Sequence, residues 1–216
     1  NFSTQKTMRI AQQLYEGIDV SGHGTIGLIT YLRTDSVRVS DEANAAAKEF
    51  ICENYGAEYF MTSENKKSND KNIQDAHEAI RPTYIELTPA LVKDSLSREQ
   101  FRLYQLIWKR FVASRMQAAK YDTISAKIDG GGYRFTASTA SLAFKGFLNV
   151  YNDDDEVINT NNSGIQKLEK SDEMFLVSHE PTQHFTQPAP HYTEASLVRE
   201  IEELGIGRPS TYATTV

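Results

Sequence analysis

The chain has 216 residues, of which 39% are hydrophobic and 24% charged, and this composition predicts a globular protein with a real core. No apolar run reaches membrane-spanning length, and a single cysteine excludes an internal disulfide. The formal net charge of −6 argues against a protein that coats duplex DNA over its whole surface.

Cysteine content, chain ends and local charge add three expectations. The lone thiol of Cys52 and the lack of a signal peptide predict a cytoplasmic protein. The chain begins at Asn1 without a methionine and ends at Val216 within an expected helix, so we expect it to be part of a longer polypeptide. Residues 97–120 carry six basic side chains against one acidic side chain, so a nucleic-acid surface, if there is one, must be local.

Two helices are predicted in the first part of the chain. Residues 4–16 place apolar side chains at helical spacing, and Gly17 is a typical C-terminal stop. The second helix begins at Ser40, whose hydroxyl can cap it, continues with two acids and an alanine-rich stripe, and ends at Gly56. Residues 61–74 are polar and predict an exposed loop.

The stretch between these helices, residues 27–36 (GLITYLRTDS), carries the first candidate site. If residues 27–33 are extended, alternate side chains share a face, so Tyr31 and Arg33 project together. A guanidinium can stabilise a phenolate, whose unperturbed pKa is about 10, and can bind a phosphate through two parallel hydrogen bonds. The pair is either a tyrosine nucleophile with its arginine or part of an ordinary half-buried strand, and spacing alone favours the strand.

A second candidate site lies in residues 75–83 (DAHEAIRPT), where Pro82 allows at most one helical turn before it. His77 and Arg81 would lie on the same side of such a turn. The His-Glu pair resembles half of a zinc protease motif, but Arg81 stands where the second histidine would be, so we expect no metal site. A histidine and an arginine that contact a phosphate, and a capped surface turn, both fit these residues.

Residues 89–116 predict two further helices, the longer one beginning at about residue 97. Its apolar side chains follow one stripe, which comprises Phe101, Tyr104, Ile107, Trp108, Phe111 and Val112. The basic residues lie largely outside this stripe, on a face that is either simply solvated or turned towards DNA.

The pattern changes to alternation at residue 120. Residues 121–128 and 133–139 flank a Gly-Gly-Gly turn and predict a β-hairpin. Residues 142–150 and 173–178 are further strand candidates, and the acidic, asparagine-rich residues 152–164 predict a loop between them. This segment contains no obvious chemistry.

The last segment begins with a proline-containing linker at 184–191 and continues with a helix that Thr193 caps and Gly205 ends. A new helix is predicted to begin at Pro209, so the pair resembles a helix-turn-helix in outline. Backbone N–H groups and hydroxyls at residues 207–211 (GRPST) could bind an anion beside an arginine. An ordinary capped helix joint explains the same residues.

Taken together and in order, these stretches resemble bacterial DNA topoisomerase I, a type IA topoisomerase family. The resemblance covers essentially the whole chain and rests on residues 27–36, 76–83 (AHEAIRPT), 103–116 (LYQLIWKRFVASRM), 183–186 (QHFT) and 194–213 (EASLVREIEELGIGRPSTYA). Leu32 after the tyrosine and the Arg-Pro-Ser-Thr ending favour topoisomerase I over its topoisomerase III relatives.

The resemblance implies that Tyr31 attacks a phosphodiester of single-stranded DNA, forms a 5′-phosphotyrosyl bond and releases a 3′-hydroxyl. Another DNA segment then passes through the gap, and the hydroxyl reverses the reaction without ATP, so the enzyme relaxes supercoils. The implied catalytic residues are Tyr31 and Arg33, and the implied DNA-binding residues are Asp35, His77, Arg81, Arg208, Ser210 and Thr211.

The resemblance also implies a mixed α+β, multi-domain fold. Residues 1–117 would form a helical domain that bears the tyrosine, 118–180 a β-rich arm segment, and 181–216 a linker and the start of a helical domain that completes the DNA groove.

The family's N-terminal metal-binding (Toprim) domain has no counterpart in these residues. We therefore expect no metal site and no other cofactor here, Mg²⁺ bound by that missing domain in the full-length enzyme, and no activity of this fragment alone. The expected partners are a single-stranded region of DNA and the missing domain, with no membrane, in a bacterial cytoplasm at the chromosome.

Three rival interpretations remain open. The chain could be a non-catalytic single-stranded DNA-binding module, built on the helix pair at 193–216 and the basic helix at 97–120. It could belong to the tyrosine recombinases and type IB enzymes, which form a 3′-phosphotyrosyl bond. A purely structural interaction domain would show no affinity for single strands.

Overall fold

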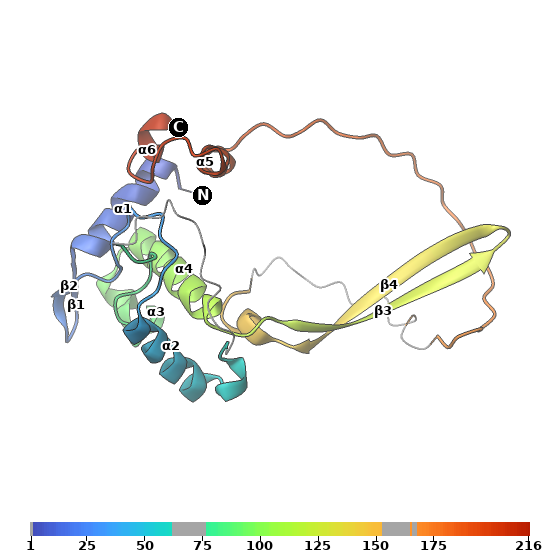
Figure 1. Ribbon diagram of the computed structural model, residues 1–216, viewed down its shortest axis with the longest axis horizontal. Coiled ribbons are helices and arrows are strands. Elements are labelled where there is room, and N and C mark those ends of the chain that lie inside the picture. Colours follow the sequence, from blue (N-terminus) through green and yellow to red (C-terminus); the bar gives the residue numbers. More distant parts are fainter. Residues whose placement is uncertain (1, 62–76, 153–164, 166–167) are drawn as a thin grey trace. The chain divides into compact units, whose positions relative to one another are not determined.

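The computed structural model describes residues 2–61, 77–152, 165 and 168–216. The chain divides into two compact units (Figure 1). Unit 1 consists of Asn1–Gln117, Phe147–Tyr151 and Tyr192–Val216, and unit 2 of Ala118–Gly146 and Asn152–His191. The predicted mixture of helices and antiparallel strands is confirmed. The three domain boundaries stay predictions, and the last helices belong to the same compact unit as the first 117 residues.

Unit 1 is mainly helical. Its elements are α1 (Thr4–Glu16), β1 (Ile18–Val20), β2 (Gly24–Ile26), α2 (Asp41–Asn54), η1 (Ala57–Tyr59), α3 (Pro89–Val92), η2 (Lys93–Ser95), α4 (Arg98–Ser114), α5 (Glu194–Glu203) and α6 (Tyr212–Thr215), with the short turn η3 (Gly146–Asn149) at the border between the units. Serine side chains cap α1, α2 and α4 by accepting a hydrogen bond from the backbone three residues on. These caps explain why the predicted helix starts agree with the structure.

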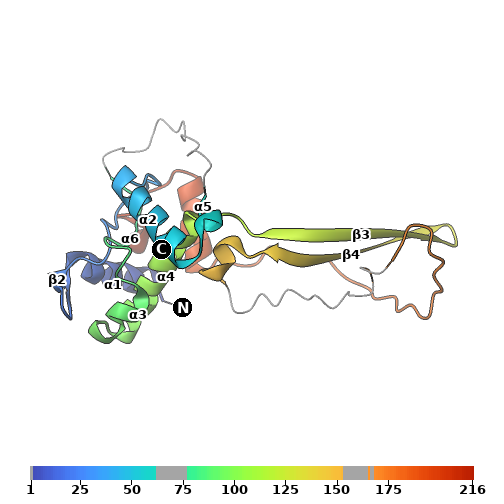
Figure 2. The same cartoon turned by 90° about the horizontal axis from the view of Figure 1, so that it is seen from below.

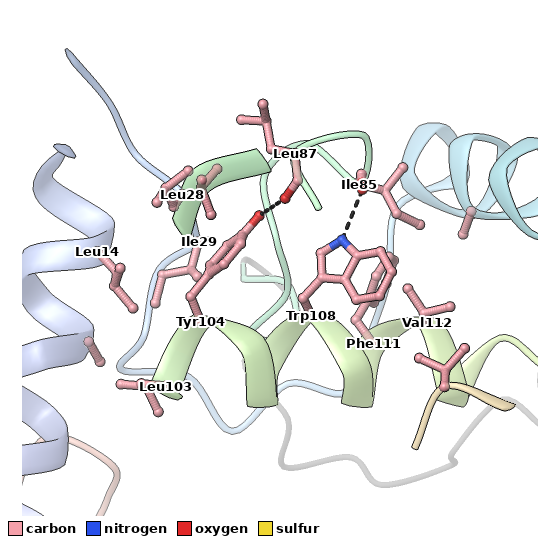
Figure 3. Close-up of a cluster of buried hydrophobic side chains, with 14 of the residues drawn as sticks. Leu14, Leu28, Ile29, Ile85, Leu87, Leu103, Tyr104, Trp108, Phe111 and Val112 are labelled. Carbon is pink, nitrogen blue, oxygen red and sulfur yellow. Dashed lines mark hydrogen bonds between the residues drawn. The ribbon is translucent and has the colours of Figure 1, made fainter. Parts of the chain in front are cut away.

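The core of unit 1 surrounds α4 (Figure 3). The indole of Trp108 donates to the carbonyl of Ile85 at 2.9 Å, and the hydroxyl of Tyr104 donates to the carbonyl of Leu87 at 2.6 Å. These bonds join α4 to the segment before α3 and satisfy two polar groups inside the core. Burial raises the pKa of Tyr104 far above its usual range, so this phenol is a neutral donor.

The predicted strand over residues 27–33 is wrong as a regular strand. Ile29 forms only an isolated antiparallel bridge with Pro82, and Leu28 and Ile29 are both buried, so the expected alternation fails there. The physical reason lies in the partner segment, because Pro82 has no N–H group with which to continue a ladder.

Unit 2 contains one long antiparallel hairpin of β3 (Lys120–Gly130) and β4 (Tyr133–Phe144), which Figure 2 shows from below. Its register runs from Lys120 opposite Phe144 to Gly130 opposite Tyr133, around the predicted glycine turn, so the hairpin prediction is confirmed.

The two further strand predictions beyond the hairpin are wrong. Residues 142–144 belong to β4 and the chain then turns through η3, while residues 173–178 are irregular. A segment becomes a strand only by pairing, and 173–178 has no ladder partner among the described residues. The predicted loops at 61–74 and 152–164 lie outside the described residues, apart from the first residue of each. No helix in the described part of the chain is both long and apolar enough to cross a membrane.

Candidate active site

A glycine brings the first candidate segment against the end of α1. A Cβ atom built on Gly27 would lie 2.6 Å from the carbonyl oxygen of Tyr15, so only glycine fits this close backbone approach. Next to it, the N–H of Leu28 donates to the carbonyl of Leu14 at 2.8 Å. The backbone that leads to Tyr31 is therefore fixed to the last turn of α1.

Backbone pairing joins the first and second motifs. The N–H of Thr30 donates to the carbonyl of Arg81 at 3.0 Å, and the N–H of Thr83 donates to the carbonyl of Leu28 at 3.0 Å. The hydroxyl of Thr30 also donates to the carbonyl of Ala79 at 2.8 Å and accepts from the N–H of Arg81 at 3.0 Å. Segments that are 50 residues apart thus lie side by side at Tyr31.

The ring of Tyr31 lies against two other rings. The ring centroid of Tyr15 lies 5.6 Å away with the planes at 69°, and that of His77 lies 5.0 Å away with the planes at 35°. Such offset and edge contacts are the favoured geometries of aromatic pairs. Tyr31 is still 37% exposed, so its ring is held while part of the side chain remains accessible.

Arg33 projects from the same short stretch as Tyr31. Leu32 between them is buried, whereas Arg33 and Tyr31 are exposed, so the predicted alternation holds over these three residues. No carboxylate in the described ranges lies within ion-pair distance of Arg33. Because Arg33 is exposed, its guanidinium is accessible to an anion from solvent.

The third motif reaches the first through one charge pair. A terminal nitrogen of Arg208 lies 3.7 Å from Oδ2 of Asp35, and the two side chains are 70% and 33% exposed. A solvent-exposed pair of this kind contributes about 1 kcal/mol or less. Two predicted DNA-binding residues are thus neighbours, held together only weakly.

Arg81 is directed towards the protein. Its Nε donates to Oε2 of Glu78 at 2.8 Å, and a terminal nitrogen donates to the carbonyl of Pro82 at 3.0 Å. The side chain is only 14% exposed. The contact of Arg81 with DNA stays a prediction, and in this structure its guanidinium stiffens the turn that carries His77.

The two hydroxyl residues of the third motif differ in their contacts. The hydroxyl oxygen of Thr211 accepts from the N–H of Arg208 at 3.0 Å and so closes the turn before α6. Ser210 is exposed, with no side-chain hydrogen bond to the described residues. Burial raises the pKa of Tyr212, which follows Thr211 in this turn.

With this geometry in place, comparison with known proteins identifies the family. The family model described as DNA topoisomerase matches residues 1–216. The chain belongs to the DNA topoisomerase family. It is similar to full-length topoisomerase I from Thermotoga maritima, with 40% sequence identity and a TM-score of 0.73 over 99% of this chain. The chain spans 34% of that protein's length. The resemblance to bacterial DNA topoisomerase I is thereby confirmed.

The described residues of this topoisomerase chain contain no group of three histidine, cysteine, aspartate or glutamate side chains that could hold a metal ion. Mg²⁺ normally takes carboxylate oxygens, and Asp35, the acid nearest in sequence to Tyr31, is paired with Arg208.

Two residues of the site are not apparent from sequence. Tyr15 falls within the predicted apolar stripe of α1, and nothing in its spacing reveals that it packs on Tyr31. Glu78 follows His77 in the second motif, and its partner Arg81 lies three residues on, a spacing that can signal an ion pair within a turn.

Proposed function

We propose that the full-length protein is a type IA topoisomerase that cuts and rejoins one strand of DNA through Tyr31. The phenolic oxygen attacks a backbone phosphorus and loses its proton, and the bond from phosphorus to the 3′ oxygen breaks. The products are a 5′-phosphotyrosyl bond and a free 3′-hydroxyl, which takes up a proton. One phosphodiester bond replaces another, so reversal reseals the strand without ATP.

The observation that carries this proposal is the setting of Tyr31 within a chain of the topoisomerase family. Its ring packs against those of Tyr15 and His77, yet the residue is 37% exposed. A nucleophile must be positioned and also accessible to its substrate. Arg33, exposed two residues along, would stabilise the phenolate or the scissile phosphate.

Other residues are proposed to bind the DNA backbone. His77 would contact a phosphate next to the cut, and Arg81 would support the turn that presents His77. Asp35 would orient the site, while Arg208, Ser210 and Thr211 would contact the strand from the turn before α6. The DNA at the site would be single-stranded, as the resemblance to type IA topoisomerases implies.

The metal and the rest of the catalytic machinery are proposed to come from another domain of the same polypeptide. In the full-length enzyme, bound Mg²⁺ would neutralise charge on the phosphate. By itself, the present fragment would neither cleave nor relax DNA. A cytoplasmic location at the bacterial chromosome follows from this activity.

The test is to trap the covalent intermediate with the full-length protein. Denaturing the protein during cleavage of an end-labelled single strand should leave DNA attached to Tyr31 through its 5′ phosphate, as peptide mapping would reveal. Tyr31→Phe should abolish the adduct. A 3′ linkage would indicate a recombinase-like or type IB enzyme. An unchanged adduct in the variant would place the nucleophile elsewhere in the full-length protein and leave this chain as a non-catalytic DNA-binding module. Plasmid relaxation by the isolated fragment with Mg²⁺ would disprove its predicted inactivity.

A further inference from the structure

A hollow of about 340 Å³ lies between α1 and the stretch that carries the candidate nucleophile. Arg9, Gln12 and Glu16 line it from α1, and Leu32 and Arg33 line it from the other side. These α1 residues lie three and four positions apart, so they face the same side of the helix. The volume lies in the range of sites that bind small ligands or parts of larger ones.

The hollow is lined by two positive charges and one negative charge, and the two on α1 lie apart along the helix. Arg9 and Arg33 are exposed, and within the described ranges neither has an ion-pair partner. Glu16 lies seven residues from Arg9, about 10 Å along the helix, and its carboxylate accepts from the amide of Gln12 at 2.7 Å. An anion in the hollow is therefore attracted by Arg9 and Arg33 and repelled by Glu16.

The hollow begins next to the proposed nucleophile. Arg33 is two residues from Tyr31, and Tyr31 packs on Tyr15, the residue before Glu16. A strand whose phosphate is attacked by Tyr31 must continue on both sides of the cut. Because the residues that line this hollow adjoin Tyr15 and Tyr31 in the sequence, it is suited to receive the adjoining part of the strand, and its two exposed guanidinium groups match a phosphate.

We propose that this hollow binds a nucleotide that flanks the scissile phosphate of single-stranded DNA, with a backbone phosphate between Arg9 and Arg33. The inference rests on the proposed function and adds Arg9, which no motif of the chain singles out, to the DNA-binding residues. The side chain of Met8 lines the same hollow and offers an adaptable apolar surface to the base.

The experiment measures binding of a short, fluorescently labelled single strand by fluorescence anisotropy over a range of salt concentrations. The full-length protein carries Tyr31→Phe throughout, so that it binds without cleaving. Adding Arg9→Ala should weaken binding by roughly threefold, the size of an exposed charge pair. It should also reduce the slope of log K against log salt by about 0.7, the effect of one lost phosphate contact on a single strand.

Three further variants make the result specific. Lys48→Ala removes an exposed positive charge from α2 and should change neither the affinity nor the slope. Arg9→Lys should restore the slope, and Glu16→Gln should tighten binding because it removes the repelling charge. If Arg9→Ala matches Lys48→Ala in both affinity and slope, the proposed binding site is overturned. That result would leave the trapped adduct at Tyr31 intact, so the two proposals fail separately.

Discussion

The ring of Tyr15 controls the freedom of the proposed nucleophile. Tyr31 can turn about its side-chain bonds, and the edge contact with Tyr15 at 5.6 Å removes part of that freedom. An aromatic pair contributes about 0.5–1.5 kcal/mol beyond its buried area. If this energy holds Tyr31 in its reactive orientation, Tyr15→Ala should lower the cleavage rate by up to about tenfold. The measurement is single-strand cleavage by the full-length protein at saturating DNA.

The matched control keeps the ring and removes only the hydroxyl. Tyr15→Phe should cleave at nearly the wild-type rate, because the edge contact needs no oxygen. A loss in Tyr15→Phe as large as that in Tyr15→Ala would show that the hydroxyl acts and that ring packing does not explain the effect.

The relative placement of side chains close in sequence was predictable. Contacts between side chains that only folding brings together were not. The projection of Tyr31 and Arg33 from one stretch follows from their spacing and holds in the structure. The contact between Tyr31 and Tyr15 depends on a turn through β1 and β2 and on the close approach at Gly27. No local pattern encodes that path.

At the scale of elements, α4 anchors the segment that follows the second motif. Its Tyr104 hydroxyl donates to the carbonyl of Leu87 inside the core. Tyr104→Phe removes this hydroxyl and leaves the carbonyl of Leu87 without its hydrogen bond. The substitution should lower the free energy of unfolding by about 1–3 kcal/mol. Thermal unfolding followed through the fluorescence of Trp108, the single tryptophan, reports on this core.

Tyr133→Phe is the matched control for this prediction. Tyr133 lies in the hairpin and is 75% exposed, so loss of its hydroxyl should change the free energy of unfolding by less than about 0.5 kcal/mol. Equal stability of the two variants would mean that the buried hydrogen bond contributes nothing net.

The starts of α1, α2 and α4 and the hairpin were predictable because their signals are local, whereas the helix predicted from Pro209 begins only at Tyr212. Serine caps and helical periodicity locate α1, α2 and α4, and a glycine turn locates β3 and β4. The strand predicted at 173–178 failed because strand formation depends on a partner elsewhere. Alternation of side chains describes a segment that can pair, and it does not supply the pairing.

At the scale of the whole chain, contacts between its two ends join α5 to α1 within unit 1. The carboxylate of Glu194 on α5 accepts from the N–H of Thr4 at 2.7 Å and from its hydroxyl at 3.0 Å, across 190 positions of sequence. Ile201 of the same helix is buried. Together with the pair of Asp35 and Arg208, these contacts hold the turn before α6 against the stretch that carries Tyr31. Each polar contact is exposed, so the attachment is weak enough to respond to solution conditions.

The attachment of α5 should therefore depend on pH. The hydrogen bonds from Thr4 lower the pKa of Glu194 below its usual value. A carboxylate with a lowered folded-state pKa stabilises the attached state at pH values above its ordinary pKa, and this contribution disappears as the pH falls through the lowered value.

Hydrogen exchange at the Thr4 amide, corrected for the intrinsic rate, should be slow at neutral pH and should accelerate below about pH 4. In the Glu194→Gln variant, the Thr4 amide should exchange faster at neutral pH, and its exchange should no longer accelerate in acid. The Glu203→Gln variant, changed on the same helix, should keep the wild-type exchange rate and the acid transition. An acid transition that persists in Glu194→Gln would assign the effect to another group.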